Sequence, residues 1–272
     1  MKLEIHVFLI CIGFIMPCRA AGSGPRETPE EVVKDVQNPI TDRTSVPILN
    51  TTAFRAGPFD RTSNATLFQP VMPIAFGRNY TVIHPIIPFV YRPDLTMPSG
   101  GQFGLGDSTL QLYFVPEPPE PLTWGFGASL LLPTASDEDL GSEKWGAGPV
   151  FAAIWATDQW SVGGRIFQHW SFAGDNSRAD VSFLTIQPLL TYGLGKGWYL
   201  ASGPLITANF NAPESDRWTV PVGGGLGKVF TIRHQHLNVS VQPYWNAAGP
   251  ESVGEWSLIV QLQSLFPRIH FP

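Results

Sequence analysis

The stretch Leu122–Leu130, LTWGFGASL, carries large or apolar side chains at every second position and glycine, serine or threonine between them. A period of two indicates a β-strand, in which successive side chains point to opposite faces. The same alternation recurs over 238–245, NVSVQPYW, and over 256–266, WSLIVQLQSLF. The chain therefore predicts repeated strands with one apolar face and one polar or small face.

Twelve such runs, separated by turn-forming residues, are found along the chain. They cover about 44–55, 66–76, 79–92, 104–115, 121–133, 145–157, 159–172, 181–193, 197–210, 217–230, 236–247 and 254–267. Longer connections at 58–65, 93–103, 134–144, 173–180, 211–216 and 248–253 alternate with shorter ones. This alternation is typical of outer-membrane barrels, which have short periplasmic turns and longer external loops. We therefore predict an all-β fold, a transmembrane antiparallel up-and-down β-barrel of about 12 strands, over residues 44–267, followed by a C-terminal tail at 268–272.

The composition excludes several classes of protein. Of the 272 residues, 14% are charged, compared with about 25% in soluble domains. The 27 glycines and 26 prolines follow no Gly-X-Y period and alternate with apolar residues, which argues against collagen and against disorder. A net charge of -5 leaves no basic surface for nucleic acid. Neither a nucleic-acid partner nor a cofactor is expected.

The amino terminus resembles a secretory signal peptide. An apolar core at 5–16 is followed by small residues ending at Ala20, and it is shorter than the roughly 20 residues of a spanning helix. We assign residues 1–20 to the signal peptide, which carries both cysteines, and expect export to the bacterial outer membrane. A mature chain without cysteine would have no disulfide to stabilise it.

Residues 21–43 are expected to form a periplasmic leader with one short helix. Thr28 and Glu31 fit a capping box, with Pro29 at the first helical position, so we predict a helix over about 29–37. A helix this short is marginal alone. We favour a solvated leader and keep a plug inside the barrel as the alternative.

All nine tryptophans are predicted to fall near strand ends, where an indole ring suits the membrane interface. In a soluble β-sandwich such residues would only pack the strand ends, but a sandwich would not explain the alternating loop lengths. One girdle would hold Trp124, Trp155, Trp160 and Trp198, and the other Trp145, Trp170, Trp218, Trp245 and Trp256.

Alternation also selects side chains that would face the lumen. They are Gln111, Tyr113, Arg165, Gln187, Asn238, Gln242, Tyr244, Gln261 and Gln263. One interpretation is a polar lining for small solutes. The other is that these groups hydrogen-bond to one another inside a packed, closed barrel. Gly223, Gly225 and Gly227 share one face and suggest close approach of neighbouring backbone.

An enzymatic alternative rests on His169 and Ser171, which share a strand face. The histidine could activate the serine hydroxyl, with Asp175 or Asp180 as the orienting acid. Such a pair is common by chance, so we predict that the chain is not an enzyme. No metal site is expected either, because His234 and His236 have no third ligand nearby.

Several longer motifs match a known family. They are QNPI at 37–40, GLGD at 104–107, LPTA at 132–135, LG at 140–141, KWGAGP at 144–149, WS at 170–171, AGD at 173–175, QP at 187–188, GWYL at 197–200 and WTVPVGGGLGKVF at 218–230. Over 37–267 the chain resembles the outer-membrane family often mislabelled "neuromedin U", which is related to the transporter group named for the meta-pathway of phenol degradation. The resemblance implies a Gram-negative outer-membrane barrel that acts as a channel. The chain departs from the family at His169 and in its tail, so either Phe266 or Phe271 could be the terminal aromatic signal.

These observations predict a passive channel or transporter-like barrel for small, hydrophobic or aromatic compounds. The alternatives are a lipid A deacylase-like hydrolase that uses His169 and Ser171, and a structural barrel with a closed lumen. Expected partners are outer-membrane lipid and lipopolysaccharide, the barrel-assembly machinery and an unidentified small solute. The loop with Asp137, Glu138, Asp139, Glu143 and Lys144 could attract cations or bridge lipopolysaccharide through divalent ions, or be an ordinary solvated loop.

Overall fold

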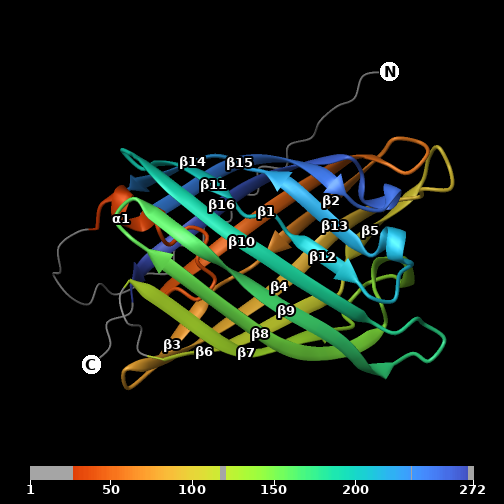
Figure 1. The fold of residues 1–272 in the computed structure, drawn as a ribbon, viewed down its shortest axis with the longest axis horizontal. Helices are drawn as coiled ribbons and strands as arrows, with labels where there is room; N and C mark the ends of the chain where they lie inside the picture. The colour runs from red at the N-terminus through yellow and green to blue at the C-terminus, as the bar shows by residue number, and fades with distance from the viewer. Residues whose placement is uncertain (1–26, 117–120, 234, 269–272) are drawn as a thin grey trace.

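The computed structural model describes residues 27–116, 121–233 and 235–268 of the chain, which form a closed antiparallel β-barrel. The first strand pairs with the second on one side and with the last on the other, so the sheet has no free edge. In Figure 1 the strands run obliquely around the long axis of the molecule. Full closure leaves no strand with an unpaired edge, as a membrane-spanning sheet requires.

Eight strands are continuous, and four are each divided into two segments. The continuous ones are β1 (Arg43–Ala56), β4 (Asn79–Pro93), β7 (Leu122–Leu132), β8 (Lys144–Ala156), β9 (Trp160–Gly174), β10 (Ser182–Gly195), β15 (Gln235–Ala248) and β16 (Trp256–Arg268). The divided ones are β2 (Arg61–Phe68) with β3 (Met72–Phe76), β5 (Gly101–Leu105) with β6 (Ser108–Val115), β11 (Trp198–Ser202) with β12 (Ile206–Asn209), and β13 (Trp218–Gly223) with β14 (Gly225–Ile232). Counted in this way, the described residues form 12 strands, and the predicted all-β barrel is confirmed.

Glycine or proline occupies the break in each of the four divided strands, and Gly106 stands between β5 and β6. Pro70 separates β2 from β3, Gly203 and Pro204 separate β11 from β12, and Gly224 separates β13 from β14. Proline has no N–H to donate to a ladder, and glycine offers no side chain to pack. The predicted ranges of the divided strands were therefore too continuous, and the range that contains β2 also began too late.

Two of these breaks adjoin in the barrel wall. The β11–β14 ladder ends at the Ala201–Gly225 pair, and pairing resumes only at Thr207–Thr219 between β12 and β13. Within this gap the Ser202 hydroxyl donates to the Gly223 carbonyl over 2.7 Å. One side-chain hydrogen bond thus stands where the ladder is interrupted.

Connections at the two ends of the barrel differ in length as expected, with one exception. The turns 77–78, 157–159 and 196–197 lie at one end, and the loops 94–100, 133–143, 175–181 and 210–217 lie at the other. The first loop at the second end spans only 57–60, because β2 begins at Arg61 and not near residue 66. Alternation of loop length is therefore real but not strict.

Polar side chains are buried inside the barrel and apolar side chains are exposed on its outer surface, which is the reverse of a soluble protein. On β16, Gln261 and Gln263 are buried inside the barrel, whereas Leu262 between them is 53% exposed on the outer surface. Phe103, Phe172 and Trp245 are similarly exposed. An apolar outer surface around a polar interior is the arrangement of a barrel whose surroundings are lipid.

The segment before β1 is buried, and the expectation of a solvated leader is wrong for its described part. Helix α1 (Pro29–Val33) begins with the predicted Thr28–Glu31 capping box but ends four residues earlier than expected. Val32, Val33 and Val36 form one buried apolar cluster with four barrel residues, Tyr199, Ala201, Val229 and Leu265. In Figure 1 the helix lies at the mouth of the barrel. We call residues 27–42 the plug.

The plug continues into the lumen after α1. Ile40 is fully buried in a second apolar cluster with Tyr80 and Val82, and its carbonyl accepts a 2.8 Å hydrogen bond from the Tyr80 hydroxyl. Earlier in the plug sequence, Gln37 accepts a 2.9 Å hydrogen bond from the Thr191 hydroxyl. Inward-facing barrel residues therefore cover the plug both at the apolar stripe of α1 and after it.

In the described part of the chain, no helix has the length and apolar character needed to cross a membrane. Residues 1–20, assigned to the signal peptide, lie outside the described residues. In the predicted tail, Arg268 belongs to β16, and Phe271 lies outside the described residues.

Candidate functional site: a polar belt inside the barrel

All nine side chains predicted to face the lumen point to the barrel interior. Eight of them are buried, and Gln187 is half-buried. Their arrangement supports hydrogen bonding between them, and whether a solute passes along them stays a prediction.

Arg165 on β9 is the central residue of the largest group of hydrogen-bonded side chains in the lumen. Its Nε donates to Gln187 Oε1 over 2.7 Å, and its Nη1 donates to Gln111 Oε1 over 3.2 Å. The same Nη1 lies 3.4 Å from His84 Nδ1. The Tyr113 hydroxyl also donates to Gln111 Oε1, over 2.8 Å. Arg165 therefore reaches across the lumen from β9 to β4 and β6.

The hydrogen bonds continue from Arg165 toward β15. Gln187 Nε2 donates to the Gly203 carbonyl over 3.0 Å, and the Gly203 N–H donates to the Tyr244 hydroxyl over 2.8 Å. The Tyr244 hydroxyl in turn donates to Gln242 Oε1 over 2.7 Å. Gly203 can take part because the break between β11 and β12 frees its backbone groups from the ladder. We call the connected set from Tyr113 to Gln242 the polar belt.

A second polar group lies on β11, β15 and β16. The Tyr199 hydroxyl donates to Asn238 Oδ1 over 2.7 Å, and Asn238 Nδ2 donates to Gln263 Oε1 over 3.2 Å. Gln261 Nε2 donates to the same oxygen over 3.1 Å. Gly227 leaves room for the Tyr199 ring, since a Cβ on this glycine would stand 2.2 Å from it. The expected close approach of neighbouring backbone is confirmed at Gly223 and Gly225, where a Cβ would stand 2.2 Å and 1.9 Å from backbone carbonyl oxygens, whereas at Gly227 a side chain comes close instead.

The proposed pairing of His169 with Ser171 is wrong. His169 Nε2 lies 2.7 Å from the hydroxyl of Ser129, two strands away on β7. Ser171 instead donates to Asp180 over 3.1 Å and accepts the Val181 N–H over 3.0 Å. Sequence reasoning missed Ser129 as a partner because the pairing depends on register across three strands.

Neither suggested acid orients His169. Asp180 accepts hydrogen bonds from Lys144 and Ser171, which hold the pKa of its exposed carboxyl below the ordinary value. Asp175 accepts the Ser177 N–H over 2.7 Å. Among the described residues, the His169 ring makes no hydrogen bond to a carboxylate. The pair therefore lacks the third member of a catalytic triad.

An ion-pair group, which we call the latch, joins the plug to the barrel. The buried Arg43 on β1 donates to Asp35 over 3.2 Å, to Glu27 over 2.7 Å and to the Phe266 carbonyl over 2.7 Å. Arg268 on β16 adds a 2.9 Å contact to Asp35. The latch thus ties the plug to the seam where the first and last strands close the barrel.

Two carboxyls at this end have shifted pKa values. Partial burial acts to raise the pKa of Glu27, but Arg43 and Arg268 outweigh it and keep the pKa below 4.5. Burial raises the pKa of Asp42, and the charge of Asp35 nearby acts in the same direction. The two groups therefore respond to acid at different pH values.

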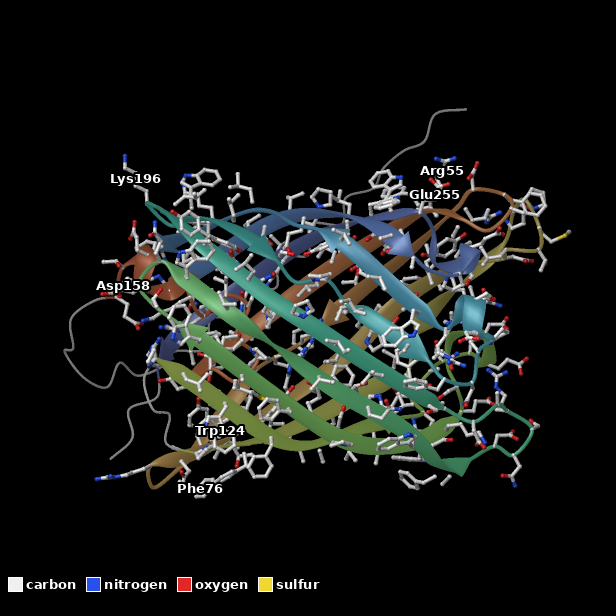
Figure 2. All side chains as sticks on the ribbon, viewed as in Figure 1. Arg55, Phe76, Trp124, Asp158, Lys196 and Glu255 are labelled. Atoms are coloured by element: carbon white, nitrogen blue, oxygen red, sulfur yellow. The ribbon has the colours of Figure 1, made fainter. Side chains whose placement is uncertain are left out.

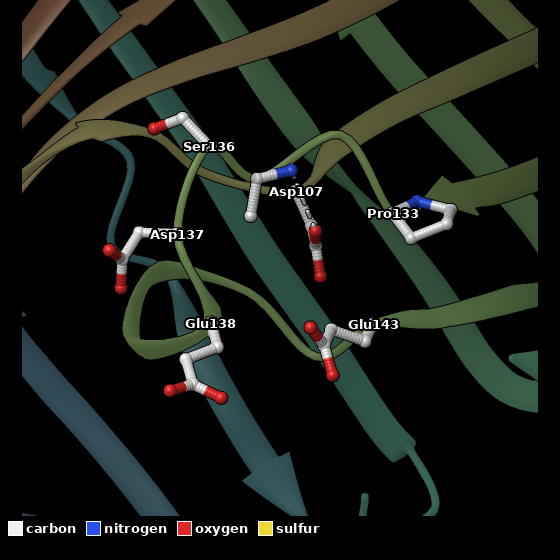
Figure 3. Close-up of a pocket in the computed structure, with 7 residues that line it drawn as sticks. Asp107, Pro133, Ser136, Asp137, Glu138 and Glu143 are labelled. Carbon is white, nitrogen blue, oxygen red and sulfur yellow. Dashed lines mark hydrogen bonds between the residues drawn. The ribbon is translucent and has the colours of Figure 1, made fainter. Parts of the chain in front are cut away.

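The acidic loop at the other end forms a small pocket of about 200 Å³, shown in Figure 3. Asp107 is already committed there, because it accepts the Ser142 N–H over 2.6 Å and the Ala135 N–H over 3.2 Å. Arg178 donates to the Glu138 carbonyl over 2.7 Å, which fixes the loop. No group of three potential metal ligands comes together in the described ranges. The idea that this loop attracts cations or binds lipopolysaccharide stays a prediction.

The tryptophans lie at the strand ends on the outer surface. Trp124, Trp155, Trp160 and Trp198 are on the plug side, and Trp145, Trp170, Trp218, Trp245 and Trp256 are on the loop side. In Figure 2 Trp124 lies in the half of the barrel that also carries Asp158 and Lys196. Their role at a membrane interface stays a prediction.

Residues 41–259 match the model of a family described as putative MetA-pathway of phenol degradation. The chain belongs to this family. The match begins just before β1 and extends into β16, so it takes in the complete polar belt. Membership in this family confirms the resemblance to the phenol-degradation group.

Solved structures with the same barrel fold include outer-membrane channels. The COG4313 outer membrane channel from Pseudomonas putida F1 is 17% identical, with 82% of this chain and 96% of that chain covered and a TM-score of 0.62. The NanC porin is 10% identical, with 82% and 99% covered and a TM-score of 0.52. These likenesses show the fold alone. No curated protein is significantly similar in sequence.

Proposed function

We propose that the protein is a passive outer-membrane channel for small hydrophobic or aromatic compounds, exported through its N-terminal signal peptide. The observation that carries this proposal is the family match over 41–259, together with the fold shared with an outer-membrane channel. The description of the family refers to phenol degradation, which supports aromatic compounds as the solute class. Lipid, lipopolysaccharide and the assembly machinery are the proposed partners in the membrane.

The interior supports passage of solutes with both apolar and polar parts. The apolar cluster around Ile40, Val82 and Val150 borders the polar belt, so a solute would meet both kinds of surface. The plug narrows one mouth of the barrel. At the other mouth, Leu140 of the acidic loop is buried against β5, near Gly104. Passage through such a lumen would depend on displacement of these segments.

Interruption of ion current by an added solute tests the proposal. Residues 21–272 would be refolded, placed in a planar bilayer and titrated with phenol, with glycerol as a polar control. We expect current steps that phenol interrupts in proportion to its concentration and that glycerol leaves unchanged. Current that phenol does not affect would contradict the proposed solute class.

The Ser129–His169 contact is the observation that favours a hydrolase as the second candidate. Lipid hydrolysis abolished by both Ser129→Ala and His169→Ala would support it. The absence of an orienting carboxylate among the described contacts of His169 weighs against it.

A further inference from the structure

Arg165 is a buried cation without a counter-charge in the described part of the barrel. Its side chain contacts two glutamines, one histidine, the Tyr113 hydroxyl and the ring of Phe167. No carboxylate lies within ion-pair distance of it in the described ranges. The chain carries a net charge of -5, so this arginine is not part of a generally basic surface. A buried charge is costly unless a group of opposite charge compensates it. A bound anion would supply the counter-charge that these contacts of Arg165 lack.

A hydrogen-bond donor beside Arg165 has no acceptor. Gln111 is fully buried, and its Nε2 has no hydrogen-bond partner. Its Oε1 accepts from both Arg165 and Tyr113, which fixes the orientation of the amide. Because Nε2 and Oε1 share one amide carbon, the free donor lies next to the guanidinium. An unsatisfied buried donor costs free energy, so a ligand oxygen at this position would be stabilising.

Apolar side chains lie next to these donors. The guanidinium carbon of Arg165 stands 5.8 Å from the centre of the Phe167 ring. Phe167 belongs to the buried cluster with Val82 and Val150, whose strands flank the same part of the lumen. The surroundings thus suit the apolar body of an organic anion better than a hydrated inorganic ion.

We propose that Arg165 and Gln111 form a binding site for the carboxylate of small aromatic acids. This inference rests on the proposed channel function and narrows its solute class. A carboxylate accepts from both donors and supplies the missing negative charge, and charge-assisted hydrogen bonds are the stronger kind. A neutral alcohol of the same size can accept from the donors but leaves the cation uncompensated.

Isothermal titration calorimetry on residues 21–272 in detergent micelles tests the site without requiring conductance. The probes are benzoate, benzyl alcohol and sodium chloride. We expect the wild type to bind benzoate at least about tenfold more tightly than benzyl alcohol, and chloride not measurably. Equal binding of benzoate and benzyl alcohol, or no binding of benzoate, would overturn the proposal.

Three variants separate the charge from the packing. Arg165→Gln should abolish the preference for benzoate. Gln111→Glu should abolish it as well, because it supplies a carboxylate to Arg165 from within the chain while keeping the size of the side chain. Arg217→Gln is the matched control, since Arg217 lies 6.0 Å from the Phe210 ring at the loop end of the barrel. Retained preference in folded Gln111→Glu would overturn the proposal even if Arg165→Gln did not fold.

Failure of this inference is distinguishable from failure of the channel. Ion current that phenol interrupts, combined with equal binding of benzoate and benzyl alcohol, would leave the channel standing and remove the carboxylate site. Selective benzoate binding to a barrel that conducts nothing would retain the site and contradict the channel.

Discussion

At the scale of single residues, Gly148 allows two side chains to meet that stand two strands apart. Ser129 on β7 is paired with Gly148 on β8. The register between β8 and β9, in which Ala147 is paired with Trp170, places His169 on β9 beside Gly148. The position between Ser129 and His169 has no side chain, so their 2.7 Å contact passes over it. A Cβ at residue 148 would also stand 1.9 Å from the Gln168 carbonyl oxygen.

Gly148→Ala should therefore destabilise the barrel. Because the neighbouring backbone must shift, we expect a loss of about 1–3 kcal/mol in the free energy of unfolding, measured by urea titration in lipid vesicles. Gly193→Ala is the control, since a Cβ there would meet its nearest atom at an ordinary 3.6 Å. Equal stability of the two variants would contradict the close contact between Gly148 and the neighbouring strand.

Residue-level predictions succeeded where they depended on alternation and failed where they depended on register. Alternation placed Gln111, Arg165 and Gln242 inside the barrel without any knowledge of their partners. It could not show that His169 meets Ser129, because that contact needs the pairing of three strands. Gly203 carried no signal beyond Gly-Pro, which marks a break but not the groups that the freed backbone would bind.

At the scale of elements, the plug is held by charge at one point and by apolar packing at others. Arg43 has no exposed side-chain surface and contacts both Asp35 and Glu27. Removing one partner of a buried ion pair leaves the other charge uncompensated, which costs about 3–5 kcal/mol. The latch is therefore the place where the plug is most easily released by a single substitution.

Asp35→Asn should release the plug in a larger fraction of molecules. The amide keeps the size of the carboxyl but loses its charge, and because Glu27 still pairs with Arg43, we expect a docking penalty of about 1–3 kcal/mol. Proteolysis of the N-terminal segment in micelles would measure this as faster cleavage. Glu30→Gln is the control, because Glu30 is an exposed residue of α1 in the same plug. Cleavage of the two variants at the same rate would contradict the role of the latch.

Acid should loosen the plug only at low pH. The pKa of Glu27 is lowered when it is docked, so its stabilising effect is present above 4.5 and is lost as the pH falls through the docked pKa. The pKa of Asp42 is raised, and its earlier protonation removes a negative charge near Asp35, which does not weaken docking. We expect cleavage rates that stay constant from pH 7 to about 5 and rise below about 4. A rise already near pH 6 would assign the response to another group.

The capping box predicted where α1 begins, but nothing in the sequence indicated where the helix lies. A stripe of Val32, Val33 and Val36 is equally consistent with a solvated leader and with a plug. The decision depends on inward-facing Tyr199, Val229 and Leu265, which come from strands distant in sequence.

At the scale of the whole molecule, the architecture was predictable because a membrane barrel repeats one simple pattern. Strands such as β7 and β16 carry the period of two over their full length, and each connection reverses the chain. Glycine and proline mark the four strand breaks in the sequence, but not which neighbouring backbone lies opposite each gap. The adjoining breaks near Gly203 and Gly224 are consequently the main departure of the wall from a regular barrel.

We infer that this barrel is a channel narrowed at one end by its own N-terminal segment. Single-channel conductance in planar bilayers tests it most directly, with residues 21–272 compared with residues 43–272, both shown to fold by heat-modifiable migration. We predict rare or small current steps for the longer chain and frequent discrete steps for the shorter one. Silence of both folded barrels would contradict the claim and favour a closed, structural barrel.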